Sequence, residues 1–219
     1  MEEFLSVLQR DDFVSNFIVH IQLSVLSVVL GILIAVPVAV LVNRSDTASN
    51  LAINIGNLGR AVPSLAILVL MIPIFGLGFD NALVALTLIA ISPVLINAIV
   101  GLRQVSPQVI DAAKGVGLSG RQILTGVQVP IAAPIIFAGI RTSAVQVVAS
   151  VTLATFIGGG GLGDYIVEGY QRGSTEIALA GALSVAVLAI GAELIFGGAE
   201  RAFTPKGLKI AQKRARGKR

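Results

Sequence analysis

The residues able to do chemistry within the apolar part of this chain are few. One arginine, Arg141, and one glutamate, Glu193, interrupt the candidate membrane-spanning stretches, and His20 is the single histidine. Because the chain has no cysteine, disulfides, thiolate metal sites and cysteine nucleophiles are excluded. One histidine cannot form a histidine metal cluster, and an intramembrane enzyme would need convergent acids or dyads of His or Ser. We therefore expect no catalytic residue, no metal site and no enzymatic activity.

Arg141 begins a polar stripe in the fourth apolar run. It lies twelve residues after Val129, which places it about 18 Å along a helix that starts there. A charge at such depth is costly and must face a cavity or a partner. Thr142, Gln146 and Ser150 follow at intervals of four and extend the stripe. We predict that this face lines a pathway or contacts a second subunit; alternatively, the span starts deeper and Arg141 snorkels to the surface.

Four other polar residues within or beside the apolar runs have simpler interpretations. Asn97 and Ser64 are weaker candidates for the same pathway, because interhelical hydrogen bonds would explain them equally well. We expect His20 to cap or pack near the end of the first run rather than to sense protons. We expect Glu193 to pair with a neighbouring basic group rather than to transfer protons.

Composition predicts a membrane protein of helices. The chain is 55% hydrophobic and only 13% charged, whereas soluble domains carry about 25% charge. Prolines and many small residues within the apolar runs favour a packed bundle. We predict an all-α, polytopic bundle, and the acidic start of the chain predicts no cleaved signal. Five runs are long enough to span a bilayer: residues 13–43, 61–79, 81–102, 129–157 and 177–198.

The basic residues set the expected orientation. They gather in the first and third connections and after the fifth run, whereas the second connection has none. By the positive-inside rule, the N-terminus lies outside and the C-terminus inside. The expected organisation is an extracytoplasmic segment at 1–12, a transmembrane domain at 13–204 with a cytoplasmic loop at 103–128, and a basic tail at 205–219. The basic residues of the first and third connections are Arg44, Arg60, Arg103, Lys114 and Arg121.

The cytoplasmic loop contains signals for two short helices. Ser106 and Pro107 form a helix start, and Gly115 and Gly117 are expected to break that helix. Ser119 then opens a capping-box pattern. We predict a pair of helices with a glycine elbow over residues 106–127, hereafter the elbow. It either docks against another protein or packs beneath its own bundle.

Residues 158–163 read GGGGLG and formally satisfy a G-x-G-x-x-G pattern. No strand precedes them, no suitable acid follows at about 20 residues, and the Lys and Ser/Thr of a phosphate loop are missing. We therefore reject a nucleotide site. The stretch is predicted to be a hinge at the outer end of the fourth run, leading into a short helix near residues 164–170.

The elbow resembles a motif of binding-protein-dependent ABC importer permeases. Asp111-Ala112-Ala113, three residues, Gly117, nine residues, Val127 and then residues 129–130 (VP) match the spacing E-A-A-x3-G-x9-I-x-L-P. The departures are Asp for Glu, Val for Ile and Val for Leu. In that family this loop sits in a groove of the cytoplasmic ATPase. The resemblance implies ATPase-coupling residues Asp111, Ala112, Ala113, Gly115, Gly117, Leu118 and Arg121.

Four further stretches resemble the osmoprotectant branch, whose permeases import glycine betaine, choline, carnitine or proline betaine. These stretches are residues 60–78, 92–102, 138–166 and 200–209. The resemblance implies a multi-pass protein of a prokaryotic cell membrane that pairs with a second permease, either a copy or a paralogue. It also implies a cytoplasmic ATPase dimer that binds ATP and Mg, an extracytoplasmic substrate-binding protein, no cofactor in this chain and no nucleic-acid partner.

In this family the outer loops meet the binding protein, which implies contacts by Gly160, Gly161, Asp164, Tyr165 and Tyr170. The chain has no Trp and its two tyrosines lie outside the runs, so an aromatic cage for a quaternary ammonium group is not expected within the spans. Substrate choice is therefore expected in the separate binding protein. The alternatives are a permease for another small solute, such as methionine or an organosulfonate, and an ATPase-independent channel or carrier.

Overall fold

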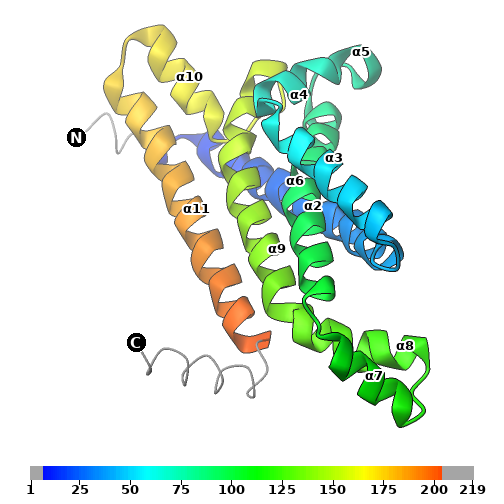
Figure 1. The fold of residues 1–219 in the computed structure, drawn as a ribbon. Helices are drawn as coiled ribbons and strands as arrows, with labels where there is room; N and C mark the ends of the chain where they lie inside the picture. Colours follow the sequence, from blue (N-terminus) through cyan, green and yellow to red (C-terminus); the bar gives the residue numbers. More distant parts are fainter. Residues whose placement is uncertain (1–6, 204–219) are drawn as a thin grey trace, which may run out of the picture.

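The computed structural model describes residues 7–203, which are all-helical. Four long helices dominate Figure 1: α2 (Asp11–Val42), α6 (Phe79–Arg103), α9 (Val129–Val151) and α11 (Thr175–Phe203). Each is part of a segment long and apolar enough to cross a membrane. The basic tail at 205–219 and most of the stretch at 200–209 lie outside the described residues.

Helix α6 is the centre of the bundle. In its most apolar part 61% of the residues are buried, against 17–28% in the other three long spans. Small residues allow this burial: a Cβ built at Gly31 of α2 would lie 2.7 Å from the Cβ of Ala90. Close helix packing through small residues, as the sequence predicted, is therefore confirmed.

The second predicted span is wrong in its bounds. Residues 61–79 are not one helix, because α4 (Ser64–Leu70) and α5 (Ile72–Phe75) are short and separate. The crossing instead begins in the predicted connection, with α3 (Asp46–Ala61), and bends by 93° before the segment Ser64–Phe75. Pro63 explains the break, since proline excludes the preceding residue from helical geometry, and Val62 is extended.

The bundle has two different ends (Figure 1). At one end α7 (Pro107–Gly115), α8 (Gly120–Ile123) and the π-helix η1 (Leu124–Gln128) project away from the long helices. At the other end lie α5, the 3-10 helix η2 (Thr152–Ile157) and α10 (Gly163–Arg172). The predicted fourth span therefore changes to 3-10 geometry over its last residues. With the bent pair counted as one crossing, residues 7–203 contain five segments long and apolar enough to cross a membrane.

Candidate functional site

The elbow has the local structure that its sequence predicts. Ser106 caps α7, accepting a hydrogen bond from the Val109 N–H at 3.4 Å. Ser119 and Gln122 form the capping box of α8. Of the two glycines expected to break the first helix, Gly115 is its last residue and Gly117 makes the turn, with a φ of 85° that favours glycine.

The elbow presents one side to solvent and packs the other. Ala113 of α7 and Ile123 of α8 are buried. Asp111 pairs with Lys114 at 3.3 Å, and both side chains are exposed. Val116 is 78% exposed, an apolar side chain beside the turn that sequence reasoning did not single out. The remaining predicted coupling residues are exposed or half-buried on the same segment: Ala112, Gly115, Gly117, Leu118 and Arg121.

Arg141 joins α9 to α11 through two carboxylates. Its guanidinium donates to Glu193 and, at 3.1 Å, to Glu200. The predicted pairing of Glu193 is confirmed. Glu200 was missed, although its position seven residues after Glu193 places both on one face of a helix. This cluster opens into a cavity of about 540 Å³, whose other lining residues are Ala138, Thr142, Val145 and Gln146.

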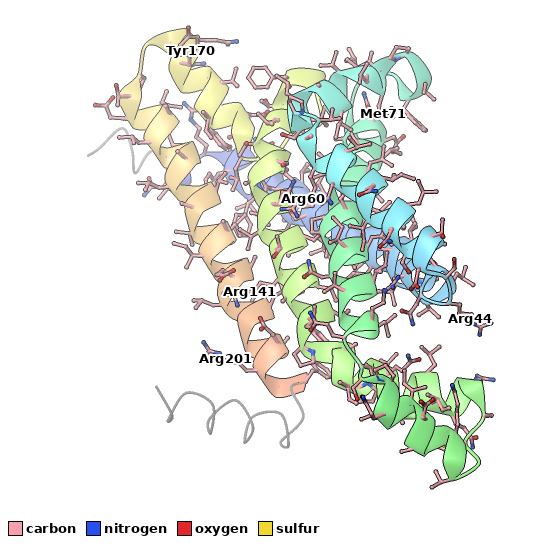
Figure 2. The ribbon with its side chains drawn as sticks, viewed as in Figure 1. Arg44, Arg60, Met71, Arg141, Tyr170 and Arg201 are labelled. Atoms are coloured by element: carbon pink, nitrogen blue, oxygen red, sulfur yellow. The ribbon has the colours of Figure 1, made fainter. Side chains whose placement is uncertain are left out.

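A second cavity, of about 240 Å³, lies at the break between α3 and α4. It brings together Ser64 and Gln146, both predicted pathway residues, with Arg60. Gln146 therefore lines both cavities. Figure 2 shows Arg60 at the end of α3 and Arg141 farther along α9 toward the elbow. Arg60 was expected to flank the first connection; the structure places it in the last turn of α3, the first helix of the bent pair.

Two predicted pathway residues do not reach these cavities. The Asn97 amide donates to the Pro93 carbonyl at 2.9 Å within α6. A Cβ built at Gly139 of α9 would lie 2.6 Å from the Asn97 Cβ, so this side chain packs against α9. Ser150 is buried. Thr142 lines the larger cavity and its hydroxyl donates to the Ala138 carbonyl at 2.9 Å. Of the predicted polar stripe, Arg141, Thr142 and Gln146 therefore line a cavity.

His20 fastens α2 to the glycine-rich stretch and to α9. Its side chain is fully buried; Nδ1 accepts from the Leu162 N–H at 3.3 Å, and Nε2 lies 3.0 Å from the Val148 carbonyl. Because the Leu162 N–H can only donate, Nδ1 is an acceptor and Nε2 carries the proton. The predicted packing role is confirmed. Gly161, with a φ of 104°, lies against the same imidazole.

The helix after the glycine-rich stretch is anchored by the start of the chain. Arg10 donates to Glu168 at 2.8 Å, and its guanidinium carbon lies 5.9 Å from the centre of the Tyr165 ring. The bond to Glu168 raises the pKa of Arg10, and burial raises the pKa of Tyr165. Tyr165 is only 1% exposed, so its assignment to a partner-contacting surface is wrong, because its ring is needed as packing for the N-terminal segment.

The other predicted outer residues differ in exposure. Tyr170 is 87% exposed at the end of α10, and Gly160 and Asp164 are half-buried. Asp164 accepts a hydrogen bond from the hydroxyl of Thr155, which holds the start of α10 against η2. Gly161 is buried beside His20. The accessible part of this end is therefore centred on Tyr170 (Figure 2).

Known proteins match nearly the whole chain. A family model described as binding-protein-dependent transport system inner membrane component matches residues 27–205. The choline transport system permease protein OpuBB of Bacillus subtilis (strain 168) is 41% identical over 190 residues, 87% of this chain and 88% of that protein. The glycine betaine/carnitine/choline transport system permease protein OpuCB of the same organism has the same identity and coverage.

A solved structure matches in fold. A chain of the MetNI methionine ABC transporter, in an inward-facing conformation, aligns with a TM-score of 0.77 and covers 88% of this chain and 96% of that chain. The sequence identity is 23%, so this likeness concerns the fold alone.

Proposed function

Because this chain belongs to the family of binding-protein-dependent transport system inner membrane components, we propose that it is the permease subunit of an ATP-driven importer of osmoprotectants. The solutes are glycine betaine, choline, carnitine or related quaternary amines, the class named for OpuBB and OpuCB. The chain is a multi-pass inner-membrane transport component rather than an enzyme. ATP belongs to a partner ATPase, and a separate binding protein delivers the solute.

The observation that carries the proposal is the exposed elbow. It projects from the bundle at the end opposite α10 (Figure 1), and its turn at Gly117 sets two short capped helices side by side. The exposed Val116 provides an apolar contact for a partner. The small, exposed side chain of Ala112 lets a partner approach the helix closely. We assign this surface to the ATPase.

This assignment fixes the orientation. The elbow, with Lys114 and Arg121, lies in the cytoplasm, as does Arg44 at the inner end of α2. Residues 1–12, α10 and the GGGGLG stretch then lie outside. The transmembrane domain keeps the limits 13–204 and the basic tail the limits 205–219. Outside, Tyr170, Asp164 and Gly160 form the surface for the binding protein.

The two cavities line the transport pathway when two permease subunits pair. Arg60 and Ser64 contribute from one side, and Arg141, Thr142 and Gln146 from α9. The second subunit is a copy of this chain or a paralogue. Closure of the ATPase dimer on ATP moves the elbow, and the paired subunits turn from inward-open to outward-open to receive solute.

The test is capture of the ATPase from the native membrane in mild detergent, using two matched variants. Gly117→Trp and Gly173→Trp both replace a glycine of positive φ (85° and 66°) with nothing within 4 Å of an added Cβ. Only Gly117 belongs to the elbow. We expect the unsubstituted chain and Gly173→Trp to retain an ABC ATPase, and Gly117→Trp to lose it.

Recovery of the chain without any ATPase, under conditions that preserve known complexes, would contradict the proposal. It would favour an ATPase-independent channel or carrier. A recovered ATPase whose companion binding protein takes methionine or an organosulfonate, and no betaine, would retain the importer but replace the solute class.

A further inference from the structure

We propose that Arg60 binds the carboxylate of the transported solute midway through the membrane, so that the permease itself distinguishes betaines and carnitine from choline. This inference rests on the proposed function and adds a selective step after the binding protein. It names a specificity-determining residue, Arg60, which the sequence places beside an apolar run and the structure places, exposed, in the lining of the cavity at the break between α3 and α4.

The position of Arg60 follows from the packing of α3 on α6. Asp46, the first residue of α3, is paired with Arg103, the last residue of α6. At the other end of α3, a Cβ added at Gly59 would lie 3.1 Å from the Ser92 hydroxyl. Ser92 is eleven residues from Arg103 and thirteen from Phe79, or about 16 and 20 Å along α6. Arg60 therefore lies at the depth of the middle of the bundle.

An arginine at that depth must face a cavity or a partner, and Arg60 faces the cavity that it shares with Ser64. Among the ion pairs within residues 7–203, none involves Arg60. Arg141, in contrast, has two carboxylates. No acidic residue lines the cavity that Arg60 shares with Ser64. The charge of Arg60 is therefore available to a solute.

The lining of this cavity suits a small carboxylate. The Arg60 guanidinium can bind two carboxylate oxygens at once. Ser64, Ser92 and Gln146 add hydroxyl and amide groups, while Ile67 belongs to its apolar wall. At about 240 Å³ the cavity is smaller than the roughly 300–1,000 Å³ typical of drug-sized pockets.

The adjoining cavity has the opposite character. Two carboxylates, of Glu193 and Glu200, and one guanidinium, of Arg141, belong to its lining, an excess of one negative charge. Gln146 lines both cavities, so the two are adjacent. One cavity thus presents a positive charge and the next a net negative charge. A zwitterion with a carboxylate and a quaternary ammonium group matches this arrangement. Choline has the ammonium group but no carboxylate, so it gains nothing from Arg60.

A purely structural role makes a different prediction. Arg60 lies in the last turn of α3, where a cation also stabilises the carbonyl groups at the helix end. Loss of that role would lower the transport of every solute equally. A role in carboxylate binding changes the ratio between solutes.

The experiment compares solutes in proteoliposomes that contain the whole importer, with its ATPase and binding protein. The variants are Arg60→Gln, Arg60→Lys and the control Arg44→Gln, which removes an exposed arginine outside both cavities. Uptake of glycine betaine, carnitine and choline is measured together with ATP hydrolysis. We expect Arg60→Gln to lower betaine and carnitine uptake relative to choline by at least about tenfold, as for a lost hydrogen bond to a charged group. Arg60→Lys should retain part of the preference, and Arg44→Gln all of it.

Equal loss of all three solutes, or an unchanged ratio, in an assembly that transports would overturn this inference alone. If the binding protein delivers no choline, betaine imported per ATP hydrolysed replaces the ratio; a value unchanged in Arg60→Gln overturns the inference. If the unsubstituted assembly imports none of the three solutes, the proposed function fails, and this inference with it.

Discussion

Arg141 shows how one residue can fix the packing of two helices and the character of a cavity. It holds Glu193 and Glu200 of α11 against α9, and all three side chains remain partly exposed to the cavity. The sequence predicted a charge at depth and a paired Glu193 from spacing alone. It did not identify Arg141 as the partner of Glu193, because the register between α9 and α11 depends on tertiary packing.

The ion cluster can be tested by comparing a single with a triple substitution. Removing Arg141 alone leaves two carboxylates without their shared cation, whereas removing all three charges leaves no uncompensated charge. We expect Arg141→Gln to lower the thermal unfolding temperature in detergent more than the triple variant with Glu193→Gln and Glu200→Gln. A triple variant as unstable as the single one would show that the charges do not act as a unit.

At the scale of elements, local sequence signals predicted the helices that are set by their own caps and turns. They did not predict the features that depend on contacts between distant segments. The elbow was predicted because Ser106, Ser119 and Gly117 act on residues within one or two turns. Helix α3 was missed because it is polar, with Arg60 near its end, and long apolar runs define predicted spans. Tyr165 was misassigned because nothing in its own segment indicates that Phe13 covers it.

The packing of α6 against α9 gives a test at this scale. A Cβ at Gly139 would lie 2.6 Å from the Asn97 Cβ and 2.9 Å from the Pro93 carbonyl, so the helices would have to move apart. We expect Gly139→Ala to destabilise the protein by about 1–3 kcal/mol, as for overpacked cores. The measurement is thermal unfolding in detergent.

Gly191 of α11 is the matched control, because nothing lies within 4 Å of a Cβ built there. Gly191→Ala should stabilise the helix by about 0.5–1 kcal/mol, since alanine loses less conformational freedom than glycine in a helix. Equal effects at the two positions would mean that the close approach of α6 and α9 does not exist in the membrane.

At the scale of the whole molecule, the two cavities must be open to water if they line a pathway. The chain has no cysteine, so the labelling of a single introduced cysteine by a thiol reagent has no background from native thiols of this chain. We expect Thr142→Cys, which lines the larger cavity, to react with a membrane-impermeant thiol reagent in the assembled importer. Val187→Cys, 68% exposed on the apolar face of α11 beside α2, should remain unreactive in lipid. Protection of Thr142→Cys in every nucleotide state would place that face against lipid.

The most direct test of the account is solute uptake by proteoliposomes that contain this chain, its ATPase and its binding protein. The account predicts uptake of glycine betaine, carnitine or choline only when ATP is present on the side of the elbow and the binding protein on the side of α10. It also predicts that Gly117→Trp abolishes this uptake while Gly173→Trp does not abolish ATPase assembly. Uptake without ATP, or uptake that Gly117→Trp leaves unchanged, would contradict the account.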